Sequence, residues 1–152
     1  MSIFTLYAEL PKNRYSHGKI WVLNEAGAVE KGPYECYGKA DSQIAKEHNN
    51  PLRDMTLPFG DHPTGTYTVV NIQKDKQPAH SYGAFFILLS PKDGAALVAK
   101  AHGRQGLAIH GGDMSVAGLM RPTEGCLRVT NEAITEIAAL VETGDEYSCT
   151  EY

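Results

Sequence analysis

Short β-prone runs separated by turn-forming residues are the feature that most limits how this chain can fold. Two such runs, 20–23 and about 28–37, are joined by the turn residues 24–27, which predicts a hairpin. Further strands are predicted by the apolar or β-branched runs at 66–72, 82–90, 107–109 and 147–152. Proline and glycine punctuate the chain between these runs. The sequence therefore predicts a mainly β fold.

One helix stands out near the C-terminus. Apolar residues recur three and four positions apart from Ile134 to Val141, which gives a single apolar stripe. Thr130 is a suitable N-cap for this helix, and Gly144 is expected to end it. The sequence thus predicts one substantial C-terminal helix packed on the sheets.

Residues 41–62 differ in character from the strands on either side. Asp41 can cap a short helix that runs through His48, and several prolines and a glycine punctuate the remainder. We expect an inserted excursion, which either shapes a substrate groove or lid or is a solvated surface loop. No repeat or linker divides the chain, so 1–152 is predicted to be a single domain.

Composition and charge exclude several classes of partner. A chain of 152 residues with 42% hydrophobic and 21% charged residues is typical of a globular domain with a real core. The net charge of −4 gives no electrostatic basis for binding nucleic acid or an anionic membrane surface. The longest strongly apolar run, 84–89, is too short for a membrane span. The chain has no glycine-rich phosphate motif, and we expect no cofactor.

The N-terminal residues do not resemble a signal peptide. Residues 1–14 lack a basic start, and Glu9 and Pro11 interrupt their apolar part. Synthesis in the cytosol, removal of a leader and export by another route all stay open.

The chain has three cysteines, an odd number that is too small for a disulfide framework. We therefore expect three thiols. Cys36 is interpreted as a small apolar core residue. Whether Cys36 and Cys149 pair stays open.

Cys126 and His110 are the candidate catalytic residues. His110 ends a short apolar run and precedes Gly111, while Cys126 follows Gly125 in a loop before the predicted helix. A thiol is nucleophilic only as the thiolate, and a neighbouring imidazole is the usual way to form one. Backbone N–H groups from Gly125 to Leu127 are suitable donors for the oxyanion of an acyl transfer. On composition and spacing alone, a buried structural cysteine and a hydrogen-bonded core histidine are the favoured interpretation.

These residues resemble the signature of the L,D-transpeptidase catalytic domain family (YkuD type). That signature is His-Gly, a loop, and then Ser/Thr-His-Gly-Cys-Ile/Leu/Val-Arg. Here the second part reads Thr123-Glu124-Gly125-Cys126-Leu127-Arg128. The hairpin ending at 37–39, the turn at 63–67 and the helix followed by 144–145 also fall in the family's order. The resemblance covers about residues 19–149.

The resemblance implies a β-sandwich-like fold with the catalytic cysteine on a loop at one end of the sheets. Cys126 would attack the carbonyl before the terminal D-alanine of a peptidoglycan stem tetrapeptide and form a thioester. His110 would move the protons, and the Gly111 carbonyl would orient its ring. An amine would then complete a 3-3 cross-link or a D-amino-acid exchange, whereas water would make the chain an L,D-carboxypeptidase. The implied partners are peptidoglycan stem peptides, in the periplasm or cell wall.

The chain departs from the family at Glu124, where a second histidine is usual. Glu124 is expected to hydrogen-bond His110, to recognise a substrate ammonium group, or to point to solvent. If it lies close to Cys126, its charge should raise the pKa of the thiol. Thr123 is expected to brace the loop through its hydroxyl group. Arg128 is expected either to bind a substrate carboxylate or to form a structural ion pair.

Other interpretations remain beside the transpeptidase. A metal site would use His102, His110, Cys126 and Asp113, but their spacing fits no compact ligand pair, so no metal is expected. A non-catalytic peptidoglycan-binding module and a secreted antibacterial effector of the same fold are further alternatives. The sequence leaves the oligomeric state open. The remaining histidines have no patterned context: His17, His48, His62, His80 and His102.

Overall fold

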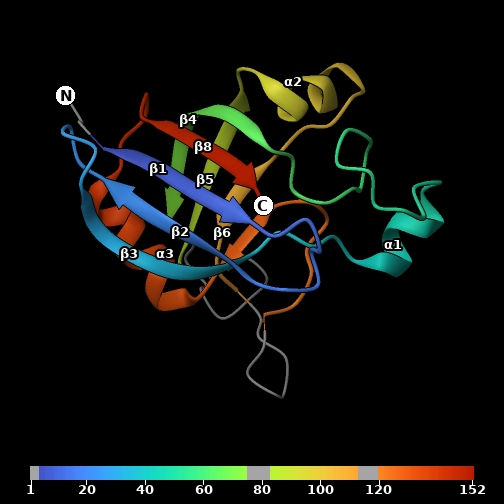
Figure 1. Ribbon diagram of the computed structural model, residues 1–152, viewed down its shortest axis with the longest axis horizontal. Helices are drawn as coiled ribbons and strands as arrows, with labels where there is room; N and C mark the ends of the chain where they lie inside the picture. The colour runs from blue at the N-terminus through green and yellow to red at the C-terminus, as the bar shows by residue number, and fades with distance from the viewer. Residues whose placement is uncertain (1–3, 75–82, 113–119) are drawn as a thin grey trace.

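The computed structural model describes residues 4–74, 83–112 and 120–152. Eight strands and three helices lie in this part of the chain (Figure 1). In chain order they are β1 (Thr5–Leu10), β2 (Gly18–Leu23), β3 (Val29–Tyr37), α1 (Ser42–Glu47), β4 (Gly65–Lys74), β5 (Phe85–Pro91), α2 (Gly94–Ala101), β6 (Ala108–His110), β7 (Leu127–Val129), α3 (Asn131–Leu140) and β8 (Glu146–Glu151). The expected mainly β fold with a C-terminal helix is confirmed.

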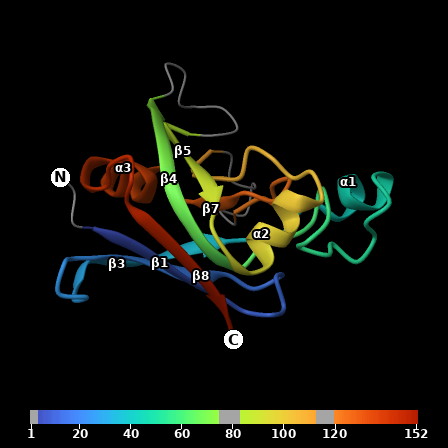
Figure 2. The same ribbon diagram turned by 90° about the horizontal axis from the view of Figure 1, so that it is seen from above.

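The strands form one sheet that closes on itself in the order β1-β2-β3-β7-β6-β5-β4-β8. Figures 1 and 2 show two walls, one built around β1, β2, β3 and β8 and the other around β4, β5 and β6. The two layers of a sandwich-like fold are thus joined at their edges by β4–β8 and β3–β7 pairing. Two neighbours are parallel, β1 with β8 and β6 with β7. The second of these pairs positions the site.

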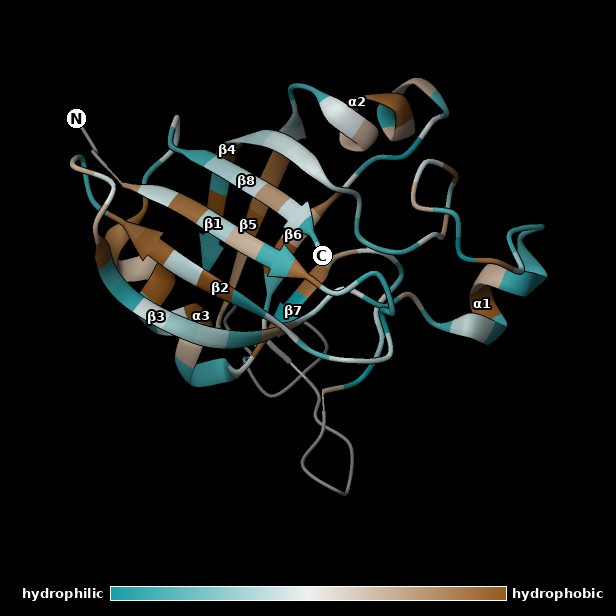
Figure 3. Cartoon of the chain, in the orientation of Figure 1, coloured by the Kyte–Doolittle hydropathy of each residue, from teal (hydrophilic) through white to brown (hydrophobic). Residues whose placement is uncertain are grey.

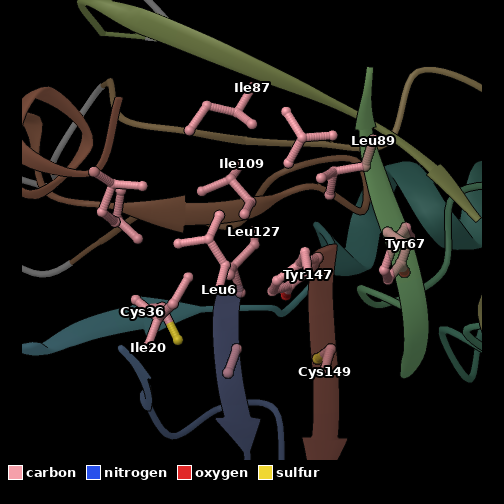
Figure 4. Close-up of a cluster of buried hydrophobic side chains, with 14 of the residues drawn as sticks. Leu6, Ile20, Cys36, Tyr67, Ile87, Leu89, Ile109, Leu127, Tyr147 and Cys149 are labelled. Carbon is pink, nitrogen blue, oxygen red and sulfur yellow. The ribbon is translucent and has the colours of Figure 1, made fainter. Parts of the chain in front are cut away.

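Alternating side chains from both walls fill the barrel. In β1, every second residue is buried, which is the period expected when one face of a strand lies inside a closed sheet. Brown apolar bands follow the strands in Figure 3, and Figure 4 shows the side chains meeting between the walls. Fully buried members include Leu6, Ile20, Ile87, Ile109 and Leu127. Loss of water from these apolar surfaces is the main stabilising contribution to the fold.

Helix α3 begins as predicted and ends earlier than predicted. The Thr130 hydroxyl accepts a hydrogen bond from the Ala133 N–H at 3.1 Å and caps the helix. The chain leaves the helix at Val141, whose backbone is extended and whose side chain stays in the core. Gly144 therefore lies in the following turn, with φ +99°, and does not end the helix.

Two strands and one helix were not predicted. Strand β1 pairs with β8 from the opposite end of the chain, and β7 has only three residues, so neither has a strong local signal. Helix α2 buries only Ala96 and Ala99, and its larger residues Leu97 and Val98 are exposed. An amphipathic stripe of alanines is too weakly apolar to reveal a helix. No helix in the described ranges is long and apolar enough to cross a membrane.

The excursion at 41–62 begins with the short helix that the sequence predicts. The Asp41 carboxylate accepts hydrogen bonds from the N–H groups of Gln43 and Ile44, at 2.9 and 3.0 Å, which caps α1. Helix α1 lies away from the barrel, beyond the ends of its strands (Figures 1 and 2). The chain returns to the barrel at His62, whose N–H donates to the Gly38 carbonyl at 2.8 Å.

Candidate active site

The parallel pairing of β6 with β7 brings the two candidate residues to the same end of the barrel. Ile109 lies beside Leu127, and His110 beside Arg128. Cys126 directly precedes β7 and His110 ends β6, so the thiol and the imidazole are positioned by adjacent strands. Both residues line one cavity of about 580 Å³. Part of its wall comes from the excursion, through Asp41, Ile44, Pro58 and Phe59, which favours the groove-shaping role over that of a plain surface loop.

His110 is buried and held in one tautomer. Its Nδ1 lies 2.7 Å from the Gly111 carbonyl oxygen, and its ring stacks on Phe86 at 5.8 Å between centroids. Because a carbonyl can only accept, Nδ1 carries the hydrogen and Nε2 the lone pair. Burial lowers the pKa of His110 to about 4, partly opposed by the Gly111 hydrogen bond and assisted by the Arg128 charge. The ring is therefore neutral at pH 7 and able to accept a proton at Nε2.

Arg128 is buried and lines the same cavity as His110 and Cys126. Its Nη1 donates to the Gly111 carbonyl at 2.9 Å, and its Nε donates to the Arg121 carbonyl at 2.9 Å. The residue is only 5% exposed. Of its two expected roles, these contacts favour a structural one, made to carbonyl oxygens.

Cys126 carries a protonated thiol at neutral pH. Burial raises the pKa of Cys126 to about 11. The backbone amide of Ala108 and the charges of Arg104 and Arg128 act in the opposite direction. The Sγ atom lies 3.6 Å from the Gly106 carbonyl oxygen, to which the thiol donates. The two pKa shifts favour a neutral thiol and a neutral imidazole at pH 7.

The Thr123 side chain makes hydrogen bonds within the loop before Cys126. The Thr123 hydroxyl donates to the Cys126 carbonyl at 2.8 Å and accepts from the Gly125 N–H at 2.9 Å. The Gly125 N–H is therefore engaged within the loop. Within the described residues, no acceptor takes the N–H of Cys126. Of the expected oxyanion donors, the Cys126 N–H is thus available beside the cavity, whereas the Gly125 N–H is not.

Gly125 is required at its position for two reasons. Its φ is +123°, which favours glycine. A Cβ atom there would overlap Nη2 of Arg104 and would lie 2.8 Å from the Gly60 carbonyl oxygen. The loop therefore packs directly against the Arg104 guanidinium.

Arg104 is a member of the site that the sequence did not reveal. Its Nη1 donates to the carbonyls of Met55 and Asp61 at 2.7 and 2.9 Å, and its Nη2 donates to Gly60 at 3.1 Å. It thus connects the excursion to the loop that precedes Cys126. Its charge also lowers the pKa of the Cys126 thiol. A single arginine without a patterned neighbour gives no sequence signal for such a role.

His62 is the second residue that the sequence did not reveal. It is wholly buried, with Nδ1 3.0 Å from the Gly125 carbonyl oxygen and Nε2 3.0 Å from the Tyr147 hydroxyl oxygen. Burial lowers the pKa of His62 to about 3, so the ring is neutral. Its only sequence signal is its place at the end of the excursion.

Glu124 lines the cavity and is exposed. Its carboxylate makes no hydrogen bond or ion pair with any residue in the described ranges, so the expected bond to His110 is absent from them. Its charge raises the pKa of Cys126, in the expected direction, although burial has the larger effect. Leu127 is fully buried in the core.

The residues of the alternative metal site do not gather in the described part of the chain. No group of three or more His, Cys, Asp or Glu side chains comes together there as metal ligands. His102 Nδ1 instead lies 2.7 Å from the Thr56 carbonyl oxygen. Asp113 and His80 lie outside the described residues. All three cysteines are free, and Cys36 is buried as expected, with its pKa raised by burial.

Comparison with known proteins identifies the family to which the sequence is similar. The L,D-transpeptidase catalytic domain (YkuD) matches residues 13–148 of the chain. No curated protein matches it. In structure it is similar to Bd1075 of Bdellovibrio bacteriovorus, with a TM-score of 0.60, 18% identity, and coverage of 97% of this chain and 47% of that one.

Two further solved structures show the same fold. One is an L,D-transpeptidase from Mycobacterium tuberculosis, with a TM-score of 0.58, 15% identity, and coverage of 97% and 57%. The other is the catalytic domain of an Enterococcus faecium L,D-transpeptidase acylated by ertapenem, with a TM-score of 0.55, 15% identity, and coverage of 98% of each chain. The chain spans 47%, 49% and 50% of the first three solved structures, about half their length. With the family match over residues 13–148, the chain belongs to the L,D-transpeptidase catalytic domain family of the YkuD type.

Proposed function

We propose that this chain is a cysteine acyltransferase that acts on peptidoglycan stem tetrapeptides through a thioester on Cys126. One observation carries the proposal. The Gly111 carbonyl fixes His110 as the Nδ1–H tautomer, in the same cavity as a thiol that needs a base. The family acts on peptidoglycan, which supports the choice of substrate. The same reasoning supports a site of action in the periplasm or cell wall.

The first half-reaction forms the thioester. Nε2 of His110 takes the proton of the Cys126 thiol as the sulfur attacks the carbonyl carbon between the third residue and the terminal D-alanine. The carbonyl oxygen becomes an oxyanion, for which the unengaged N–H of Cys126 is the available donor. The C–N bond then breaks, and the protonated His110 returns its proton to the leaving amine of D-alanine.

The second half-reaction resolves the thioester. His110 takes a proton from the incoming nucleophile, which attacks the thioester carbonyl, and the sulfur leaves and recovers that proton. An amine from a neighbouring stem peptide gives a 3-3 cross-link, and a free D-amino acid gives an exchange product. Water gives a shortened stem and makes the chain an L,D-carboxypeptidase. Family membership favours the amine.

Glu124 and Arg128 are proposed to have different roles. The first binds the substrate, and the second positions His110. Glu124 lines the cavity with a charge that no described residue neutralises, which suits an ammonium group on the stem peptide. Arg128 positions His110 through Gly111 rather than binding a substrate carboxylate.

Incubation of the purified chain with disaccharide-tetrapeptides, with the products identified by mass, tests the proposal. We expect loss of D-alanine together with a cross-linked dimer, and neither product from Cys126→Ala or His110→Ala. Loss of D-alanine without a dimer, even with excess acceptor amine, would establish the carboxypeptidase.

A carbapenem provides an independent test of the nucleophile. We expect intact-mass spectrometry to show one covalent adduct on the wild type and none on Cys126→Ala. Absence of both the adduct and the tetrapeptide products would overturn the enzyme proposal and favour a non-catalytic binding module.

A further inference from the structure

A chain of hydrogen bonds runs from the barrel core to the peptide unit that precedes the candidate nucleophile. Tyr147 in β8 contacts His62 at 3.0 Å, and His62 contacts the Gly125 carbonyl oxygen at 3.0 Å. The rings of Tyr67 and Tyr147 both pack against this histidine, with centroids 5.7 and 5.8 Å from that of His62 and 5.2 Å from each other. Both tyrosines lie among the buried side chains in Figure 4.

The direction of these hydrogen bonds is fixed by chemistry. The Gly125 carbonyl can only accept, so Nδ1 of His62 carries the hydrogen. The ring is neutral, so its Nε2 can only accept, and the Tyr147 hydroxyl donates to it. The donor and the acceptor of each hydrogen bond are therefore fixed. Tyr147 donates to His62, and His62 donates to Gly125.

The carbonyl that His62 holds belongs to the same peptide unit as the N–H of Cys126. In a trans peptide the two groups lie in one plane and point in opposite directions. The one cis peptide bond among the described residues is Gly32–Pro33, so the Gly125–Cys126 unit is trans. A donor that holds the carbonyl on one side consequently aims the N–H to the other side.

Two further groups beside this peptide unit are already occupied. The Gly125 N–H donates to Thr123, and the Gly125 Cα packs against Arg104. The Cys126 carbonyl accepts from the Thr123 hydroxyl. The N–H of Cys126 has no acceptor in the described part of the chain, and Cys126 lines the cavity.

We infer that His62, supported by Tyr147, is a positioning residue that orients the Gly125–Cys126 peptide unit so that the Cys126 N–H faces the developing oxyanion. The inference rests on the proposed function, because it assigns the device that prepares that site for acyl transfer. His62 touches neither the substrate nor the thiol, and it acts through the Gly125 carbonyl.

Two reactions of the same thiol separate this role from a merely structural one. Acylation by a carbapenem passes through a tetrahedral intermediate with an oxyanion. Alkylation by iodoacetamide forms the S–C bond as iodide leaves and the thiol proton passes to solvent or base, so no oxyanion forms. Loss of oxyanion stabilisation should slow the first reaction and spare the second, whereas a displaced or deactivated thiol should slow both.

The test compares both rates for the wild type and four variants. In His62→Leu we expect acylation to fall about 100-fold, the usual effect of losing one oxyanion donor, and alkylation to stay within a few-fold. His62→Asn keeps an N–H donor near the Nδ1 position and should recover part of the acylation rate. Tyr147→Phe should slow acylation about fivefold, the effect of one ordinary hydrogen bond.

Tyr67→Phe is the matched control. Its hydroxyl donates to the Pro63 carbonyl and not to His62, so its acylation rate should equal that of the wild type. If acylation and alkylation fall together in the His62 and Tyr147 variants, or if acylation does not fall, the inference is wrong. If His62→Leu does not fold, Tyr147→Phe against Tyr67→Phe decides the question. A wild type that is alkylated but never acylated would instead refute the proposed function.

Discussion

Arg128 and His110 share one acceptor, because both donate to the carbonyl oxygen of Gly111, at 2.9 and 2.7 Å. The guanidinium fixes the carbonyl, and the carbonyl fixes the imidazole. The positive charge of Arg128 also lowers the pKa of His110 and of Cys126. Arg128 therefore controls both the orientation of the proposed base and the proton affinities of the reacting pair.

Replacing Arg128 should consequently change the pH profile as well as the rate. We expect Arg128→Gln to reduce kcat/KM for tetrapeptide turnover about 10- to 100-fold, the cost of losing hydrogen bonds made by a buried cation. The pKa of His110 should rise from about 4, because one charge that disfavours its protonation is gone. The acid limb of the kcat/KM profile should therefore move to higher pH.

Arg128→Lys is the matched control for that variant. It keeps the positive charge but cannot reach the Gly111 and Arg121 carbonyls with one planar group. We expect a reduced rate with the acid limb near its wild-type position. Equal shifts of the limb in the two variants would argue against an effect of charge.

The protonated state of Cys126 predicts a steep pH dependence for alkylation. With the pKa of Cys126 at about 11, the thiolate fraction rises about tenfold for each pH unit between 7 and 10. The iodoacetamide rate should rise accordingly, followed by intact-mass spectrometry with Cys126→Ala as the blank for the two buried cysteines. A rate that levels off near pH 7 would indicate a preformed thiolate–imidazolium pair instead.

Gly125 offers a test of the loop's packing. In Gly125→Ala, the new methyl group would overlap the Arg104 guanidinium at a φ of +123°, so the side chain and the backbone would both be strained. We expect a loss of about 3 kcal/mol in the free energy of unfolding. Gly144→Ala is the control, because its φ is +99° and no atom lies within 4 Å of the new Cβ. That variant should lose only about 1 kcal/mol in urea denaturation.

Local signals account for the parts of the fold that the sequence predicted. The hairpin of β2 and β3, the Thr130 cap of α3 and the Asp41 cap of α1 all depend on residues that lie close together in the chain. Strand β1 and helix α2 depend on distant partners. Strand β1 pairs with β8 from the other end of the chain. Helix α2 packs on β4 and buries only two alanines. No short window of sequence contains that information.

The candidate site divides in the same way. The Gly111 carbonyl bond of His110 and the Thr123 brace of Cys126 connect residues within three positions of each other. Both contacts were expected from the sequence, and the resemblance to the family implied the first of them. The contact of His62 with Gly125 arises because the end of the excursion packs against the loop that precedes Cys126. Arg104 reaches that excursion from the end of α2. The roles of His62 and Arg104 therefore depend on the three-dimensional arrangement of the closed barrel and not on the spacing of residues in the sequence.

Glu124, where the chain departs from its family, separates an electrostatic role from a recognition role. Its charge raises the pKa of Cys126, so Glu124→Gln should lower that pKa and increase the thiolate fraction at pH 8. Because the carboxylate is exposed and screened, we expect the iodoacetamide rate to rise only about two- to threefold. If Glu124 also binds a substrate ammonium group, the variant should raise KM for the tetrapeptide about tenfold without lowering kcat.

Glu124→Asp and a neutral substrate complete this test. The aspartate keeps the charge, so its alkylation rate should match that of the wild type. A tetrapeptide whose side-chain amine is acetylated should lose affinity for the wild type and not for Glu124→Gln, since the proposed partner is already missing in the variant. An equal loss of affinity in both proteins would assign ammonium recognition to another group. In that case the exposed carboxylate would affect the reaction only through the pKa of Cys126.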